Sequence, residues 1–171
     1  MNKAKRILEN MNLEERTAME TVIGVIPDHA DIGEQAEYIN DLLNCAEKKN
    51  VSVEAAMRKC GGHCLEQSII DTAKDLYSKA ADMEEFLVKL NQTGIGGGSL
   101  RIENGKVNAA YKECYCDIPH AIKKINPMYC QCSAGWFQSF FSAVLGKAVS
   151  VKVVDTITNG ASECTFEIYC L

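Results

Sequence analysis

The chain has 171 residues and a formal net charge of −5, with 18 Lys and Arg residues scattered along its length. Nucleic-acid-binding proteins usually carry a basic face, so we expect no nucleic-acid partner. The length fits one domain that buries about two thirds of its unfolded surface. No apolar run follows the basic first residues or approaches the ~18 residues of a membrane helix. The sequence therefore predicts a cytoplasmic protein without a membrane partner.

The N-terminal half carries apolar residues at helical spacing. The predicted helices cover residues 3–24, 31–49, 52–58, 65–79 and 83–90. Pro27 and Asp28 separate the first two helices, and Asp31 can cap the second. Gly61 and Gly62 are expected to kink or end the third, because glycine weakens a helix interior.

The composition changes in the glycine-rich segment 92–99, which we interpret as a hinge that leads into a sheet. Asn104 and Gly105 follow a short β-type run at 100–102 and precede another at 106–111. An Asn-Gly pair between two such runs is typical of a tight hairpin.

The last third of the chain predicts a helix over 134–145 and strands at 149–153 and 165–169. Ser133 can cap this helix and Gly146 can end it. Together these elements predict an α+β fold: a helical N-terminal half, then an antiparallel sheet of about four strands packed by one long helix.

The expected division is a helical region over 1–92 and an α+β region over 93–171. We expect the two regions to form one compact unit together.

Nine cysteines are many for such a chain, and in a cytoplasmic protein they stay reduced. Cys114 and Cys116 form one Cys-x-Cys pair, and Cys130 and Cys132 form another. In a strand, residues two apart point to the same face, so the sulfurs of both pairs could converge across the intervening loop. Four thiolates suit zinc or an iron–sulfur cluster, while inert buried thiols and a redox pair are the alternatives.

Cys60 and Cys64 enclose two glycines and a histidine. They could supply further metal ligands, or a reactive thiol pair if Cys64 begins a new helix. His120 lies in the loop between the Cys-x-Cys pairs and could act as a metal ligand or as a donor in a pocket.

Aromatic residues in the second half predict a ligand pocket between the helix that carries Trp136 and the sheet. Core packing is the alternative interpretation of the same residues. The predicted ligand-binding residues are Tyr111, His120, Tyr129, Trp136 and Phe140.

One pattern in the last third resembles the C-terminal half of the vinyl-reductase-type small-molecule-binding domain. That domain also forms the effector-sensing part of some bacterial transcription regulators that respond to aromatic compounds. The residues that carry the resemblance are Cys130, Trp136, Gly146, Val149–Val151, Gly160, Cys164 and Phe166.

The resemblance implies a zinc ion near the pocket, held in that family by Cys, Glu, Cys and Cys. It carries the first ligand onto Cys130 and the last onto Cys164, but the middle two onto Val153 and Thr156, which do not bind metal. The complete predicted metal set is Cys60, Cys64, Cys114, Cys116, Cys130, Cys132 and Cys164.

A closer resemblance is to a group of uncharacterised cysteine-rich bacterial proteins. These combine a helical N-terminal half, which carries a Cys-Gly-x-x-Cys element like that at Cys60–Cys64, with the same Cys-x-Cys-Ser-x-Gly-Trp tail. The resemblance covers about two thirds of the chain and implies no established activity.

The function that we predict is a cysteine-rich, zinc-binding domain that binds a small organic ligand. One alternative is a metal-dependent hydrolase, because the tail also resembles amino-thiazoline carboxylate hydrolase-like proteins; another is a thiol-redox or iron–sulfur protein. No catalytic residue stands out, and enzymatic activity is left open. The related sensory domains tend to form dimers, which makes a homodimer a further expectation.

Overall fold

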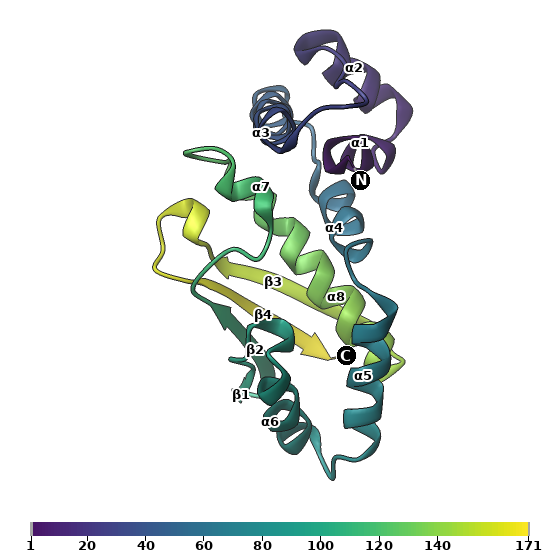
Figure 1. Ribbon diagram of the computed structural model, residues 1–171, viewed down its shortest axis with the longest axis vertical. Coiled ribbons are helices and arrows are strands. Elements are labelled where there is room, and N and C mark those ends of the chain that lie inside the picture. Colours follow the sequence, from purple (N-terminus) through teal and green to yellow (C-terminus); the bar gives the residue numbers. More distant parts are fainter. Residues whose placement is uncertain (1, 171) are drawn as a thin grey trace.

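The computed structural model describes residues 2–170 and confirms the α+β fold, with helices first and an antiparallel sheet after them (Figure 1). The helices are α1 (Lys3–Glu9), α2 (Leu13–Ile23), α3 (Ile32–Lys49), α4 (Glu54–Gly62), α5 (Gln67–Ser78), α6 (Met83–Thr93), α7 (Asp117–His120) and α8 (Gln131–Leu145). The strands are β1 (Arg101–Glu103), β2 (Lys106–Tyr111), β3 (Val149–Asp155) and β4 (Cys164–Cys170). Short 3₁₀ helices lie at η1 (Ile95–Gly97), η2 (Pro127–Cys130) and η3 (Ile157–Asn159).

The sheet has the strand order β1-β2-β4-β3, and every neighbouring pair is antiparallel. The predicted hairpin between β1 and β2 is confirmed. Asn104 and Gly105 both have positive φ, 52° and 75°, as the two central residues of a type I′ turn require. Tyr111 at the end of β2 lies directly opposite Cys164 at the start of β4.

Helix α8 lies across one face of the sheet, and its buried side chains include Phe137, Phe140, Phe141 and Val144. Gly146 ends the helix in the left-handed conformation, as predicted. This helix brings the residues that precede it to the centre of the molecule (Figure 1).

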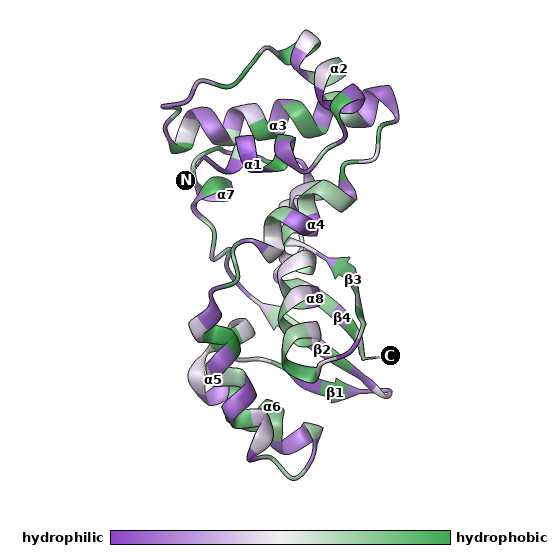
Figure 2. Ribbon diagram, turned by 90° about the vertical axis from the view of Figure 1, so that its right-hand side faces the viewer, coloured by the Kyte–Doolittle hydropathy of each residue, from purple (hydrophilic) through white to green (hydrophobic). Residues whose placement is uncertain are grey.

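Two apolar cores hold the chain together. One joins α5, α6 and α8 to the sheet, and the other joins α1, α3 and α4 to residues around Ile118 and Tyr129. The molecule is elongated: α1–α3 gather at one end, α5 and α6 at the other, and α4 and α8 lie between (Figure 2). Helices α5 and α6 therefore share a core with the sheet and not with the helices that precede them.

Three predicted helix ends differ from the structure. The expected helix over 3–24 is two helices, because the Asn12 side chain accepts a hydrogen bond from the Glu15 amide and starts α2 anew. The third helix does not end at Gly61 but includes it. Ser133 does not cap α8, because η2 already winds the chain before the helix begins at Gln131.

Gly61 and Gly135 allow α4 and α8 to cross at very short distance. A Cβ atom at Gly61 would lie 1.8 Å from the Cys132 carbonyl oxygen, and one at Gly135 would lie 2.0 Å from the Arg58 carbonyl oxygen. Packing across this crossing outweighs the weak helix propensity of glycine, which explains why α4 continues through Gly61.

Among residues 2–170, none of the helices combines the length and the apolar character that crossing a membrane requires.

Candidate functional site

A cavity of about 780 Å³ lies beside the α4–α8 crossing, and we call it the main cavity. Its walls come from the first turns of α1, the end of α4, the glycine-rich segment before β1, the chain that follows β2, and the start of α8. Segments far apart in the sequence therefore line this one cavity.

Aromatic rings form an apolar wall of the main cavity, contributed by Tyr111, Tyr115, Trp136 and Phe137. The Tyr111 ring lies 5.5 Å from that of Tyr115 and 6.5 Å from that of Phe137, and the Trp136 and Phe137 rings meet edge to face at 5.4 Å. Burial raises the pKa of Tyr111, whose hydroxyl is hydrogen-bonded to Ser133. Tyr111 thus keeps its proton at neutral pH and presents a neutral polar group.

The structure brings Tyr111, Tyr129 and Trp136 to the main cavity, which lies at the start of α8. The pocket was predicted between this helix and the sheet, where Phe141 and Phe166 are fully buried. Phe140 is fully buried and lies behind Trp136, with the two rings stacked at 5.1 Å. His120 lines a neighbouring cavity, where its Nε2 lies 2.7 Å from the Cys114 carbonyl oxygen.

Several residues of the cavity wall had no predicted role in a binding site, among them Lys3, Arg6, Tyr115, Phe137 and Ser133, which was predicted only as a helix cap. Tyr115 stands between Cys114 and Cys116, and Ser133 follows Cys132, so their positions beside the cysteine pairs could have drawn attention to them. Lys3 and Arg6 carried no such signal, because only long-range packing brings α1 to this place.

In each Cys-x-Cys pair, the two cysteine side chains lie at different places in the structure. Cys130 and Cys132 lie in helical backbone, where residues two apart point roughly 200° apart. Cys114 and Cys116 follow the end of β2 in an irregular turn, so the alternation of a strand does not apply there. The prediction that the sulfurs of a pair share one face required extended backbone, and the structure has extended strand backbone at neither pair.

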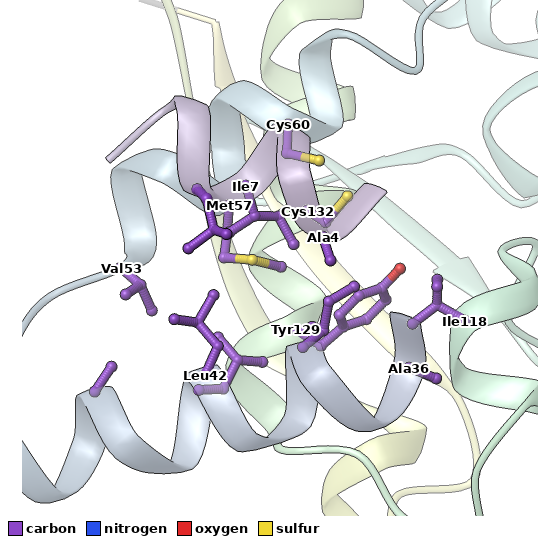
Figure 3. Packing of buried hydrophobic residues seen from close by; sticks show 14 of the residues in the cluster. Ala4, Ile7, Ala36, Leu42, Val53, Met57, Cys60, Ile118, Tyr129 and Cys132 are labelled. Atoms are coloured by element: carbon purple, nitrogen blue, oxygen red, sulfur yellow. The ribbon is translucent and has the colours of Figure 1, made fainter. Parts of the chain in front are cut away.

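The first thiol trio consists of Cys60, Cys64 and Cys132. The Cys132 thiol interacts with both of the others, and the Cys64 thiol donates to the Cys60 carbonyl oxygen over 3.5 Å, so the three side chains lie close together. Figure 3 shows the Cys60 and Cys132 sulfurs pointing toward each other. The hydrogen bond from Cys132 lowers the pKa of Cys60, and the corresponding bond raises the pKa of Cys64. The thiolate of this trio therefore forms first at Cys60, which is fully buried.

Cations from α1 lie against the sulfurs of this region. The Lys3 ammonium donates to the Cys116 sulfur over 3.1 Å, and an Arg6 Nη1 donates to the Cys64 sulfur over 3.4 Å. Burial alone would lower the pKa of Lys3, but the nearby sulfurs of Cys132, Cys116 and Cys64 raise it overall. Lys3 thus stays charged inside the molecule.

The second thiol trio consists of Cys114, Cys130 and Cys164. The Cys164 thiol is hydrogen-bonded to both of the others, and it also accepts a bond from the Ile157 amide over 3.4 Å. The hydrogen bond from Cys164 lowers the pKa of Cys114, while a bond to Cys164 raises that of Cys130. Cys114 is the partly exposed member of this trio, whereas Cys130 and Cys164 are buried.

Thiols are the right chemistry for zinc, but their placement in these trios does not match a zinc site. Within the described part of the chain, no group of three or more His, Cys, Asp or Glu side chains is placed so as to hold a metal ion. Each trio supplies three thiols, whereas a structural zinc site has four ligands. A zinc site would therefore require a fourth ligand beside one of the trios.

A second cavity, of about 650 Å³, adjoins the first, and we call it the basic cavity. Its charged and ionisable lining groups are Lys112, Glu113, Cys114, His120, Lys123 and Lys124. Cys114 lines both cavities and marks their boundary.

The fold resembles that of a known sensory domain. The phenol-responsive sensory domain of the transcription activator PoxR, solved with phenol, aligns over 93% of this chain and 91% of that chain, with 10% identity and a TM-score of 0.51. A Cs H-NOX mutant with 4-cyano-L-phenylalanine at site 5 aligns over 98% of this chain and 92% of that chain, with 17% identity and a TM-score of 0.42. At these identities the likeness concerns the fold alone.

No curated protein matches this sequence. The model of one protein family, described as "Family of unknown function (DUF6144)", matches residues 3–171. The expectation of an uncharacterised family is thereby confirmed.

Proposed function

The chain belongs to the DUF6144 family of unknown function, and we propose that it binds a small organic molecule in the main cavity. The observation that carries the proposal is the cavity itself. Its volume of about 780 Å³ falls within the ~300–1,000 Å³ of small-molecule sites. Its wall also has the composition of such sites, mostly apolar and aromatic with a few polar groups.

The lining favours a ligand with a flat apolar body and a hydrogen-bond acceptor. Trp136 is partly exposed and offers a ring face, beside the edge of Phe137. Lys3 and Arg6 supply positive charge elsewhere in the wall. The similar sensory domain responds to phenol, so phenols and aromatic acids are the first class of compounds to test.

The finer expectations remain predictions. The vinyl-reductase-type resemblance and the cytoplasmic location are supported by sequence patterns, and zinc is supported by the chemistry of the thiols. The hydrolase alternative has less support. Its mechanism needs a bound metal ion that activates a water molecule, and the described thiols are not placed to hold such an ion.

Trp136 provides the test, because it is the one tryptophan of the chain and lines the cavity. Titration with phenols and aromatic acids should change its fluorescence in a saturable manner. Ser133→Leu should weaken the change, because the larger side chain narrows the cavity, while Ser142→Leu, on the same helix outside the lining, should leave it intact. Equal affinity in the Ser133→Leu variant would place the ligand elsewhere and reject the proposal.

A further inference from the structure

Cys114 is placed where a dissolved reagent can reach it from two sides. It lines the main cavity and the basic cavity, and its side chain is partly exposed. The first trio has one exposed member, Cys64, which lines the main cavity but not the basic cavity. Among the members of the two trios, Cys114 alone lines both cavities.

A second thiol is already in contact with Cys114. Cys164 is fully buried at the start of β4, borders the main cavity together with Cys114, and lies close enough to lower the pKa of the Cys114 thiol. The chain after β2 passes over this point because Tyr111, three residues earlier, pairs directly with Cys164. Cys164 has no exposed surface and does not line the basic cavity, so a molecule that enters through the basic cavity meets Cys114 first, which is the arrangement of an attacking and a resolving cysteine.

The basic cavity favours an anionic molecule. Lys112, Lys123 and Lys124 line it, and Glu113 is its one acidic lining residue. A cleft lined mainly by one sign of charge raises the local concentration of the opposite sign.

We propose that Cys114 and Cys164 form a thiol–disulfide exchange site for small anionic disulfides that enter through the basic cavity. The Cys114 thiolate attacks one sulfur of the disulfide, forms a mixed disulfide and releases one thiolate. Cys164 then attacks the Cys114 sulfur, loses its proton to the departing thiolate, and closes a Cys114–Cys164 disulfide. Two protein thiols are oxidised and one disulfide is reduced to two thiols, so atoms and electrons balance.

This activity is separate from the binding function proposed for the main cavity, which is read from Trp136 fluorescence. Either can fail without the other, because exchange is read from covalent mass changes at cysteines.

Oxidised glutathione, which is anionic, is the probe for the test, and the full reduced chain is the sample. Peptide mapping by mass spectrometry under non-reducing conditions should find the Cys114–Cys164 disulfide in the wild type. The Cys164→Ala variant should instead accumulate one glutathionyl group on Cys114, and Cys114→Ser should show neither product.

Cys170→Ser is the matched control, since Cys170 is also partly exposed but lines neither cavity. Circular dichroism checks that each variant is folded, and wild-type mapping gives the result independently of any variant.

Charge selectivity is tested by comparing oxidised glutathione with cystamine, a cationic disulfide. The double variant Lys123→Glu/Lys124→Glu should slow the reaction with oxidised glutathione by about tenfold at low salt and should not slow the reaction with cystamine. The double variant Lys74→Glu/Lys147→Glu, with the same charge change outside both cavities, should leave both rates unchanged.

Two outcomes would overturn the exchange site: modification of the exposed Cys64 before Cys114, or no reaction at Cys114 under conditions that modify a model thiol. Equal rates for the anionic and the cationic disulfide would overturn the assignment of the basic cavity as the entrance.

Discussion

Arg58 connects three elements through a single side chain. Its guanidinium donates to Gln131 over 3.0 Å and to Gln138 over 3.2 Å, both on α8, and to the Val151 carbonyl of β3 over 2.9 Å. The same group forms an ion pair with Glu54 one turn earlier on α4. A planar guanidinium can satisfy these acceptors together, whereas an ammonium cannot.

We therefore expect Arg58→Lys to lower the free energy of unfolding by about 1–3 kcal/mol, since charge-assisted bonds to half-buried acceptors are lost. Urea unfolding followed by circular dichroism measures the change. Arg101→Lys is the control, because Arg101 forms an exposed pair with Glu103 and should change stability by less than about 0.5 kcal/mol. Equal effects of the two substitutions would show that Arg58 is not a connecting residue.

At the residue scale, the spacing of the cysteines is plain in the sequence, but the direction in which their sulfurs point was predicted wrongly. Cys-x-Cys places two sulfurs together only in extended backbone, and the pair at Cys130 and Cys132 is helical. The misleading signal was Ser133, a good N-cap residue that suggested a later helix start. Pro127 at the first position of η2 was the better signal, because its fixed φ suits the first turn of a helix.

At the element scale, the sheet was more predictable than the helices. The Asn104-Gly105 turn and the alternating valines of β3 are local signals, and the structure confirms the three strands that they imply, β1, β2 and β3. The helix over 3–24 was wrong because its apolar spacing continues across the break, while the Asn12 cap that interrupts it is a single polar residue. Helix α4 was predicted too short because its glycines serve a contact with α8 that lies over 70 residues further along the chain.

The crossing of α4 and α8 yields a second prediction. Gly135→Ala should lower the free energy of unfolding by about 2–3 kcal/mol or prevent folding, because the added methyl group collides with the backbone of Arg58 and the helices must separate. Ser142→Ala, on the same helix and half-buried, should have little effect. Thermal unfolding compares the two variants. A fully stable Gly135→Ala protein would mean that the helices do not cross this closely in solution.

At the scale of the whole molecule, the main cavity lies where the two cores meet. Tyr129 and Cys132 belong to the core of α1, α3 and α4, while Tyr111 and Phe137 belong to the core of the sheet, and all four line the cavity. No local pattern in the sequence encodes this meeting, because it depends on how α4 and α8 cross. The aromatic residues could be suspected from the sequence, but the cavity could not.

A ligand in that position contacts both cores, so it should stabilise the molecule as a whole. At a concentration one hundred times its dissociation constant, a ligand that binds only the folded state adds about 2.7 kcal/mol. We expect one unfolding transition that moves to higher temperature, measured by differential scanning calorimetry. Ser133→Leu, which narrows the cavity, should show a smaller increase with the ligand than the wild type. A transition that splits in two, with only one part shifted, would contradict stabilisation of both cores.

Removal of metal ions should leave the fold in place, because the apolar cores and not the thiol trios account for most of the buried surface. A chain of this length buries about 70% of its unfolded surface without any ion. A structural zinc in a small domain contributes ~10 kcal/mol, so its loss would be conspicuous. We expect the unfolding temperature in EDTA and a thiol reductant to stay within about 2 °C of that in zinc-saturated EDTA, a difference of less than about 1 kcal/mol. A decrease of tens of degrees, accompanied by release of stoichiometric zinc, would mean that the thiols gather around an ion in solution and would restore the metal site predicted from the sequence.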